Sequence, residues 1–97
     1  MTNNAIAERV LLFAEDPEKR VTVRLGEPKL NTETADYECP YELTGQGIKI
    51  DRFAAGLDAF QALQLAILAI GAHVVSIEQT NATRLRWLDR DAGFPVQ

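Results

Sequence analysis

The segment from Gly56 to Gln79 constrains the fold of this chain most, because it is long, apolar and almost free of charge. It reads GLDAFQALQLAILAIGAHVVSIEQ, and no Asp, Glu, Lys or Arg lies between Asp58 and Glu78. A chain of 97 residues has room for one hydrophobic core and for few elements that build it. We therefore expect this segment to be the central helix of a single domain spanning residues 1–97.

The start of this helix is marked by Asp58, a good N-cap residue, with Gln61 placed to complete a capping box. Apolar residues then recur with the helical period along a stripe that we expect to face the core. This main stripe consists of Phe60, Leu63, Ile67, Ile70, Val74 and Ile77.

A second, smaller apolar stripe lies on the other side of the predicted helix, and it is formed by Leu65, Leu68, Ala72 and Val75. One sheet covers only one stripe of a helix, so the second stripe predicts another cover. A second copy of the chain would give a homodimer, and the C-terminal tail is the competing cover. We take these four residues as the candidate binding site, for self-association.

Four segments before the helix alternate or accumulate apolar and β-branched residues in the manner of strands. They cover residues 5–13, 21–25, 37–43 and 48–53, and turn residues separate them. Residues 84–88 alternate as well and predict a short C-terminal strand. The predicted fold class is α+β: an antiparallel four-stranded meander with one long helix packed on one face.

The third of these strands places Cys39 among inward-facing residues, between Tyr37 and Tyr41. A nucleophilic Cys39–His73 pair would require the helix to bring His73 close, and we favour a buried, inert cysteine. With one cysteine and one histidine in the chain, an intrachain disulfide and a Cys/His zinc site are excluded.

The outward-facing Glu38 and Glu42 are poor candidates for a catalytic acid–base pair, and we favour a solvated face of the sheet. On one strand they stand about 13 Å apart, whereas paired carboxylates in hydrolases work at roughly 5–9.5 Å. We therefore predict no catalytic residue, no metal site and no cofactor, and we expect the protein not to be an enzyme.

Charge and the N-terminal residues bear on partners and location. The net charge is −4 and Lys and Arg form no cluster, which argues against binding to nucleic acid or to an anionic membrane surface. The first residues lack a basic stretch, and Glu8 and Arg9 interrupt the apolar run, so we predict no signal peptide and a cytoplasmic location. Polar residues within the helix, among them Gln61 and Gln64, favour a soluble core helix over a membrane span.

Three motifs make the chain resemble a family of small bacterial proteins described as a domain of unknown function. They are Cys39-Pro40-Tyr41, the helix start from Gly56 to Ala66, and Trp87-Leu88 followed by Gly93-Phe94-Pro95. The resemblance implies no activity and no site residue. For the aromatic residues Trp87 and Phe94 we favour packing of the tail onto the core, with a partner anchor as the alternative.

Three functions remain open from the sequence. The first is a non-enzymatic interaction domain that self-associates through the helix. The second is an immunity- or antitoxin-like protein that uses its acidic charge to bind a basic protein partner. The third is a small-molecule binding protein that uses a cavity between sheet and helix.

Overall fold

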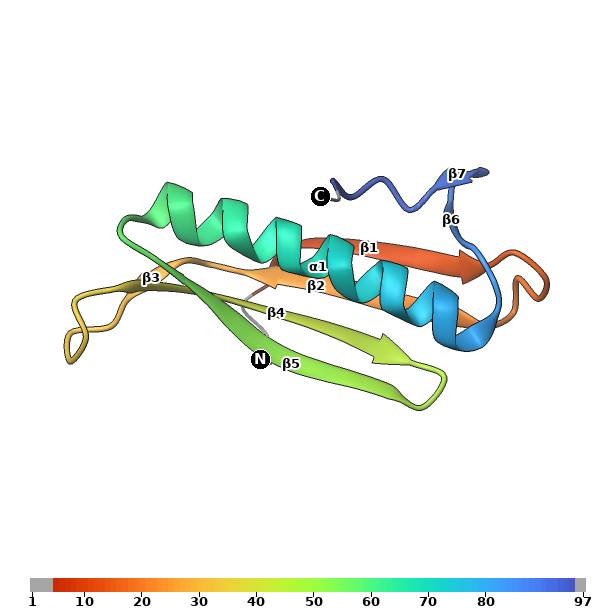
Figure 1. The fold of residues 1–97 in the computed structure, drawn as a ribbon, viewed down its shortest axis with the longest axis horizontal. Helices are drawn as coiled ribbons and strands as arrows, with labels where there is room; N and C mark the ends of the chain where they lie inside the picture. Colours follow the sequence, from red (N-terminus) through yellow and green to blue (C-terminus); the bar gives the residue numbers. More distant parts are fainter. Residues whose placement is uncertain (1–4, 96–97) are drawn as a thin grey trace.

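The computed structural model describes residues 5–95 and has an α+β fold, in which one long helix lies on one face of an antiparallel sheet (Figure 1). Its elements are β1 (Ala5–Phe13), β2 (Arg20–Gly26), β3 (Lys29–Leu30), β4 (Tyr37–Gly45), β5 (Ile48–Gly56), α1 (Ala59–Asn81), β6 (Leu85–Trp87) and β7 (Arg90–Asp91). The sheet is ordered β3-β4-β2-β1-β6-β7, and β5 pairs with the other edge of β4.

The predicted strands correspond to β1, β2, β4 and β5, which pair consecutively, and the predicted C-terminal strand is β6. The described sheet is larger than the predicted four-stranded meander, because it has seven strands. The short strand β3 lies between the second and third predicted strands, where turn residues were expected, and its Lys29 pairs with Glu38 of β4. The strand β7 pairs with β6 across a two-residue turn, Leu88-Asp89, with φ of 50° and 64°. Such a turn ordinarily contains Asn or Gly, so the sequence gives little sign of it.

The core lies between the sheet and α1. Inward-facing side chains of β1, β2 and β4 are buried, and they are Leu11, Phe13, Val21, Val23, Cys39, Tyr41 and Leu43. The alternating residues of the same strands face the open side of the sheet, as predicted for Glu42, which lies beside Arg24 there. The helix buries Ala62, Ala66, Ile70, Gly71, Val74 and Ile77 against this layer.

The prediction for Phe60 was wrong, because its side chain is 76% exposed, whereas Ala62 and Ala66 are fully buried. The helix is therefore rotated so that small residues face the sheet in its first turns. The connection to β5 is the physical reason: a Cβ on Gly56 would lie 2.4 Å from the Ala62 nitrogen. At so close an approach only alanine-sized side chains fit between helix and sheet.

Both ends of α1 are capped. Asp58 is the N-cap, as predicted, and its carboxylate accepts a 2.7 Å hydrogen bond from the backbone N–H of Gln61. The Gln61 side chain reaches back as predicted, but it accepts from the Leu57 N–H at 2.6 Å rather than from Asp58. At the other end Ala82 adopts the left-handed conformation that closes a helix, and its N–H bonds back to the Gln79 carbonyl.

Candidate functional site

The second apolar stripe of α1 lies on the side of the helix that faces away from the sheet. The side chain of Leu65 is 40% exposed, Ala72 is exposed, and Leu68 and Val75 are half-buried. The buried residues Ala66, Ile70 and Val74 occupy the opposite side. The four candidate residues therefore share one accessible surface.

This surface extends by one polar residue at each end. The positions Gln61, Leu65, Leu68, Ala72, Val75 and Gln79 follow one another at alternating steps of four and three residues. Such steps place side chains in a single line along one helix, as at the contact line of a two-helix coiled coil. We call these six residues the outer seam.

The outer seam carries no charge. Its members are two glutamines, two leucines, an alanine and a valine, and the charged residues Asp58 and Glu78 lie outside it. By length and composition alone α1 could also cross a membrane, although a core helix meets the same criterion, and 33% of its apolar window is buried within the molecule. A surface of this kind can approach a copy of itself without bringing like charges together.

The C-terminal tail runs alongside β1 and does not cross the helix, so it leaves the outer seam uncovered (Figure 1). A cavity lies between β1, β2, α1 and the tail segment Gly93–Pro95, and the helix lines it with Ile67 and Ile70. We call it the tail cavity. The competing cover considered for the second stripe thus lies elsewhere in the described part of the chain.

Packing of Trp87 and Phe94 onto the core is confirmed, since both are partly buried against it. Arg9 joins them, because its guanidinium carbon lies 3.8 Å from the centre of the Trp87 ring system and 5.0 Å from that of Phe94. The same guanidinium donates a 3.1 Å hydrogen bond to the Ala92 carbonyl. Sequence reasoning did not find this role of Arg9, although the residue shares the inward alternation of Leu11.

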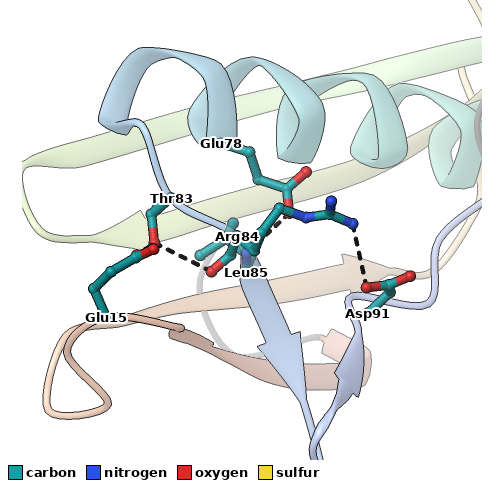
Figure 2. A network of polar contacts seen from close by, with 6 residues as sticks. All are labelled: Glu15, Glu78, Thr83, Arg84, Leu85 and Asp91. Atoms are coloured by element: carbon teal, nitrogen blue, oxygen red, sulfur yellow. Dashed lines mark hydrogen bonds and ion pairs between the residues drawn. The ribbon is translucent and has the colours of Figure 1, made fainter.

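A polar network fixes the junction between α1 and β6, as Figure 2 shows. One Glu78 oxygen accepts a 2.8 Å hydrogen bond from the Leu85 N–H and lies 3.5 Å from the Arg84 guanidinium, which also pairs with Asp91 at 3.2 Å. The Thr83 hydroxyl donates to Glu15 in the turn after β1. These carboxylates take partners from within the chain, so the network holds the end of the helix to the sheet.

His73 faces Tyr41 rather than Cys39. Its Nε2 lies 3.1 Å from the Tyr41 hydroxyl, between the helix and β4. Burial lowers the pKa of His73, and the positive charge of Arg52 lowers it further. Burial raises the pKa of Tyr41, and the Arg52 charge opposes that rise.

Cys39 is fully buried, and its thiol donates to the Gly26 carbonyl at 3.4 Å. Burial raises the pKa of this thiol, which keeps it protonated and unreactive. This is the environment of a structural cysteine, as the sequence predicted.

The two glutamates of β4 have separate partners. Glu38 accepts a 2.9 Å hydrogen bond from the Asn31 side chain, and Glu42 lies 3.6 Å from Arg24. Within residues 5–95, no group of three or more His, Cys, Asp and Glu side chains could hold a metal ion.

Comparison with known proteins identifies a family. No curated protein and no solved structure matches the chain. A family model does match, over residues 7–96, and so covers the described fold except the first two residues of β1. The chain therefore belongs to the family described as Domain of unknown function (DUF6968), and its resemblance to such a domain is confirmed.

Proposed function

We propose that the protein is a non-enzymatic interaction domain that self-associates through the outer seam of α1. The observation that carries the proposal is the accessible, uncharged line of residues at coiled-coil spacing on a helix whose other side is buried. Four of its six members are the apolar residues Leu65, Leu68, Ala72 and Val75. Contact with a second copy would remove them from water.

The order of side chains along the seam favours an antiparallel pair of helices. Seam positions are symmetric about Ile70, so a two-fold axis there opposes Leu68 to Ala72 of the second copy. The same axis opposes Leu65 to Val75. Each contact then joins a larger side chain to a smaller one, which lets the helices interdigitate.

The ends of the seam fit the same arrangement. Gln61 of one copy would lie near Gln79 of the other, where amide side chains can exchange hydrogen bonds. A parallel pair would instead oppose Leu68 to Leu68 and Ala72 to Ala72, leaving crowded and empty layers in alternation. The antiparallel arrangement is therefore the one we propose.

The size of the seam sets the expected affinity. Stable interfaces bury about 800 Å² on each partner, and one line of six side chains on a single helix covers less than that. The proposed dimer is accordingly weak and depends on protein concentration in the micromolar range or above.

Cysteine cross-linking tests both the surface and the orientation. Leu65→Cys and Val75→Cys are made as separate variants, mixed, and oxidised; the buried Cys39 stays out of reach. The antiparallel dimer predicts a disulfide between the two different variants and few disulfides within either one alone. Homodisulfides of each variant alone would show a parallel pair, and no cross-link in any mixture would contradict the proposal.

A basic protein partner and a lipid partner have less support than a second copy of the chain. On the open face of the sheet Arg24 lies 3.1 Å from Glu8 and 3.6 Å from Glu42, so part of the acidic charge that could attract a basic protein is compensated. For a lipid partner, the glutamines of the seam are unfavourable in a hydrocarbon environment. If the protein floated with neutral vesicles and formed no cross-link, the partner of the outer seam would be lipid and not a second copy. That outcome would contradict the proposal.

A further inference from the structure

We propose that the tail cavity binds a small organic carboxylate with an apolar body, and that Arg9 receives the carboxylate. This binding site is separate from the outer seam, because no seam residue lines it. Its volume is about 260 Å³. Its apolar lining includes Val23, Leu25, Ile67, Ile70, Phe94 and Pro95.

The polar end of the cavity is set by Arg9. Its guanidinium carbon lies over the rings of both Trp87 and Phe94, at 3.8 Å and 5.0 Å from their centres. The face of an aromatic ring attracts a guanidinium, and a guanidinium stacked on a ring keeps its N–H groups available for other partners. An arginine has five N–H donors, and within residues 5–95 Arg9 makes one hydrogen bond, from Nη1 to the Ala92 carbonyl.

Gly93 permits this arrangement. It has a φ of 85°, and a Cβ at this position would lie 2.8 Å from Arg9 Nη1. The tail can therefore pass directly over the guanidinium only because glycine stands there. The result is a cation held in place at the rim of an apolar cavity.

The charge around the cavity favours an anion. Glu8 also lines the cavity, but its carboxylate pairs with Arg24 at 3.1 Å, and Arg24 in turn lies 3.6 Å from Glu42 on the open face of the sheet. The Glu8 charge is thus compensated on the far side of β1. No carboxylate within residues 5–95 forms an ion pair with Arg9, which leaves the remaining N–H groups of the guanidinium able to donate to a ligand carboxylate.

The volume limits the ligand. Sites for drug-sized molecules measure roughly 300–1,000 Å³, so this cavity takes a smaller molecule, of the size of benzoate or a short fatty acid. A ligand of that size binds in the millimolar range when it makes one ion pair and buries a single apolar group.

Trp87 supplies the readout, since it is the single tryptophan of the chain and lies 3.8 Å from the Arg9 guanidinium. Benzoate is titrated into the full chain while the fluorescence of Trp87 is followed, and benzamide serves as the neutral probe of the same shape. We expect a saturable change with benzoate and about tenfold weaker binding of benzamide, because benzamide forms no ion pair.

Variants separate the two parts of the site. Arg9→Gln should bring the affinities for benzoate and benzamide close to each other. Ile67→Phe enlarges a side chain of the apolar lining while Arg9 is retained, and it should abolish binding of both probes. Ser76→Phe, on the exposed opposite flank of α1, should bind benzoate like the unmodified protein.

Three results would overturn the proposal. They are equal affinity for benzoate and benzamide in the unmodified protein, the absence of saturation up to about 10 mM benzoate, and undiminished binding by Ile67→Phe. Because Ile67→Phe does not alter Arg9, the test stands even if Arg9→Gln loosens the tail.

Discussion

Gly56 lies against the first turn of the helix so closely that a Cβ on it would come within 2.4 Å of the Ala62 nitrogen and 2.9 Å of the Ala62 Cα. This contact joins the last residue of β5 to the first buried residue of α1. It sets the distance between helix and sheet and, with that distance, which side chains can face inward. Because the small residues face the sheet, the residues of the outer seam lie on the opposite, accessible side of the helix.

Substitution of Gly56 by alanine should therefore destabilise the fold. The added methyl group meets backbone atoms that cannot move aside, and overpacking of this kind lowers the free energy of unfolding by about 2 kcal/mol or more. Chemical denaturation measures it. Gly47→Ala is the matched control, since open space surrounds Gly47 and only its positive φ of 78° opposes the change, at about 1 kcal/mol. Equal losses at the two positions would contradict the close approach.

The rotation of the helix predicts opposite effects at two neighbouring positions. Ala66→Leu inserts a larger side chain into the fully buried contact and should cost about 1–3 kcal/mol. Phe60→Ser removes a large apolar side chain that is 76% exposed, and should change the stability by no more than about 0.5 kcal/mol. A core-facing Phe60 would give the reverse order in the same denaturation experiment.

The stability should fall as the pH drops through the ordinary titration range of histidine. The folded-state pKa of His73 is lowered from its usual 6.5 by burial and by Arg52, so below about pH 6.5 the unfolded chain binds more protons than the folded one. The stabilising contribution of neutral His73 is fully present above about pH 6.5, and it is lost as the pH falls from that value through the lower folded-state pKa. Denaturation at about pH 7.5 and about pH 5.5 measures the loss, and His73→Gln should reduce it. An unchanged difference in His73→Gln would assign the loss to other groups.

Gly93→Ala should displace Arg9 from Trp87. The new Cβ would lie 2.8 Å from Arg9 Nη1, and the φ of 85° is unfavourable for alanine. We expect a shift in the emission of Trp87 and a loss of about 1–2 kcal/mol, the size of a partly desolvated cation–π contact. Gly47→Ala, which has the same backbone strain far from the tryptophan, should leave the emission unchanged.

Much of the architecture follows from local sequence signals. Alternation or accumulation of apolar and β-branched residues placed β1, β2, β4 and β5, and Asp58 marked the start of the helix, because these features depend on residues close together in the chain. The rotation of α1 could not be read in the same way. Phe60 is more apolar than Ala62, and only the close approach of Gly56 shows that the smaller residue faces the sheet.

The two proposed sites also differ in how far local sequence signals identify them. The candidate stripe of Leu65, Leu68, Ala72 and Val75 could be identified from helical spacing alone, and it lies on the accessible side of α1. The position of Arg9 could not, because it depends on the tail returning to β1 across more than eighty residues of sequence. An isolated arginine in a strand gives no signal of the aromatic rings that a distant segment brings to it.

Self-association through the outer seam is tested most directly by the molar mass in solution over a range of concentrations. Light scattering or sedimentation equilibrium should show a mass that rises toward twice that of one chain, and Leu68→Glu should hold the protein at the mass of one chain. Phe60→Glu, an equally drastic change at an exposed position of the same helix outside the seam, should associate like the unmodified protein. A single-chain mass at every concentration, or an association that Leu68→Glu leaves unchanged, would contradict the account.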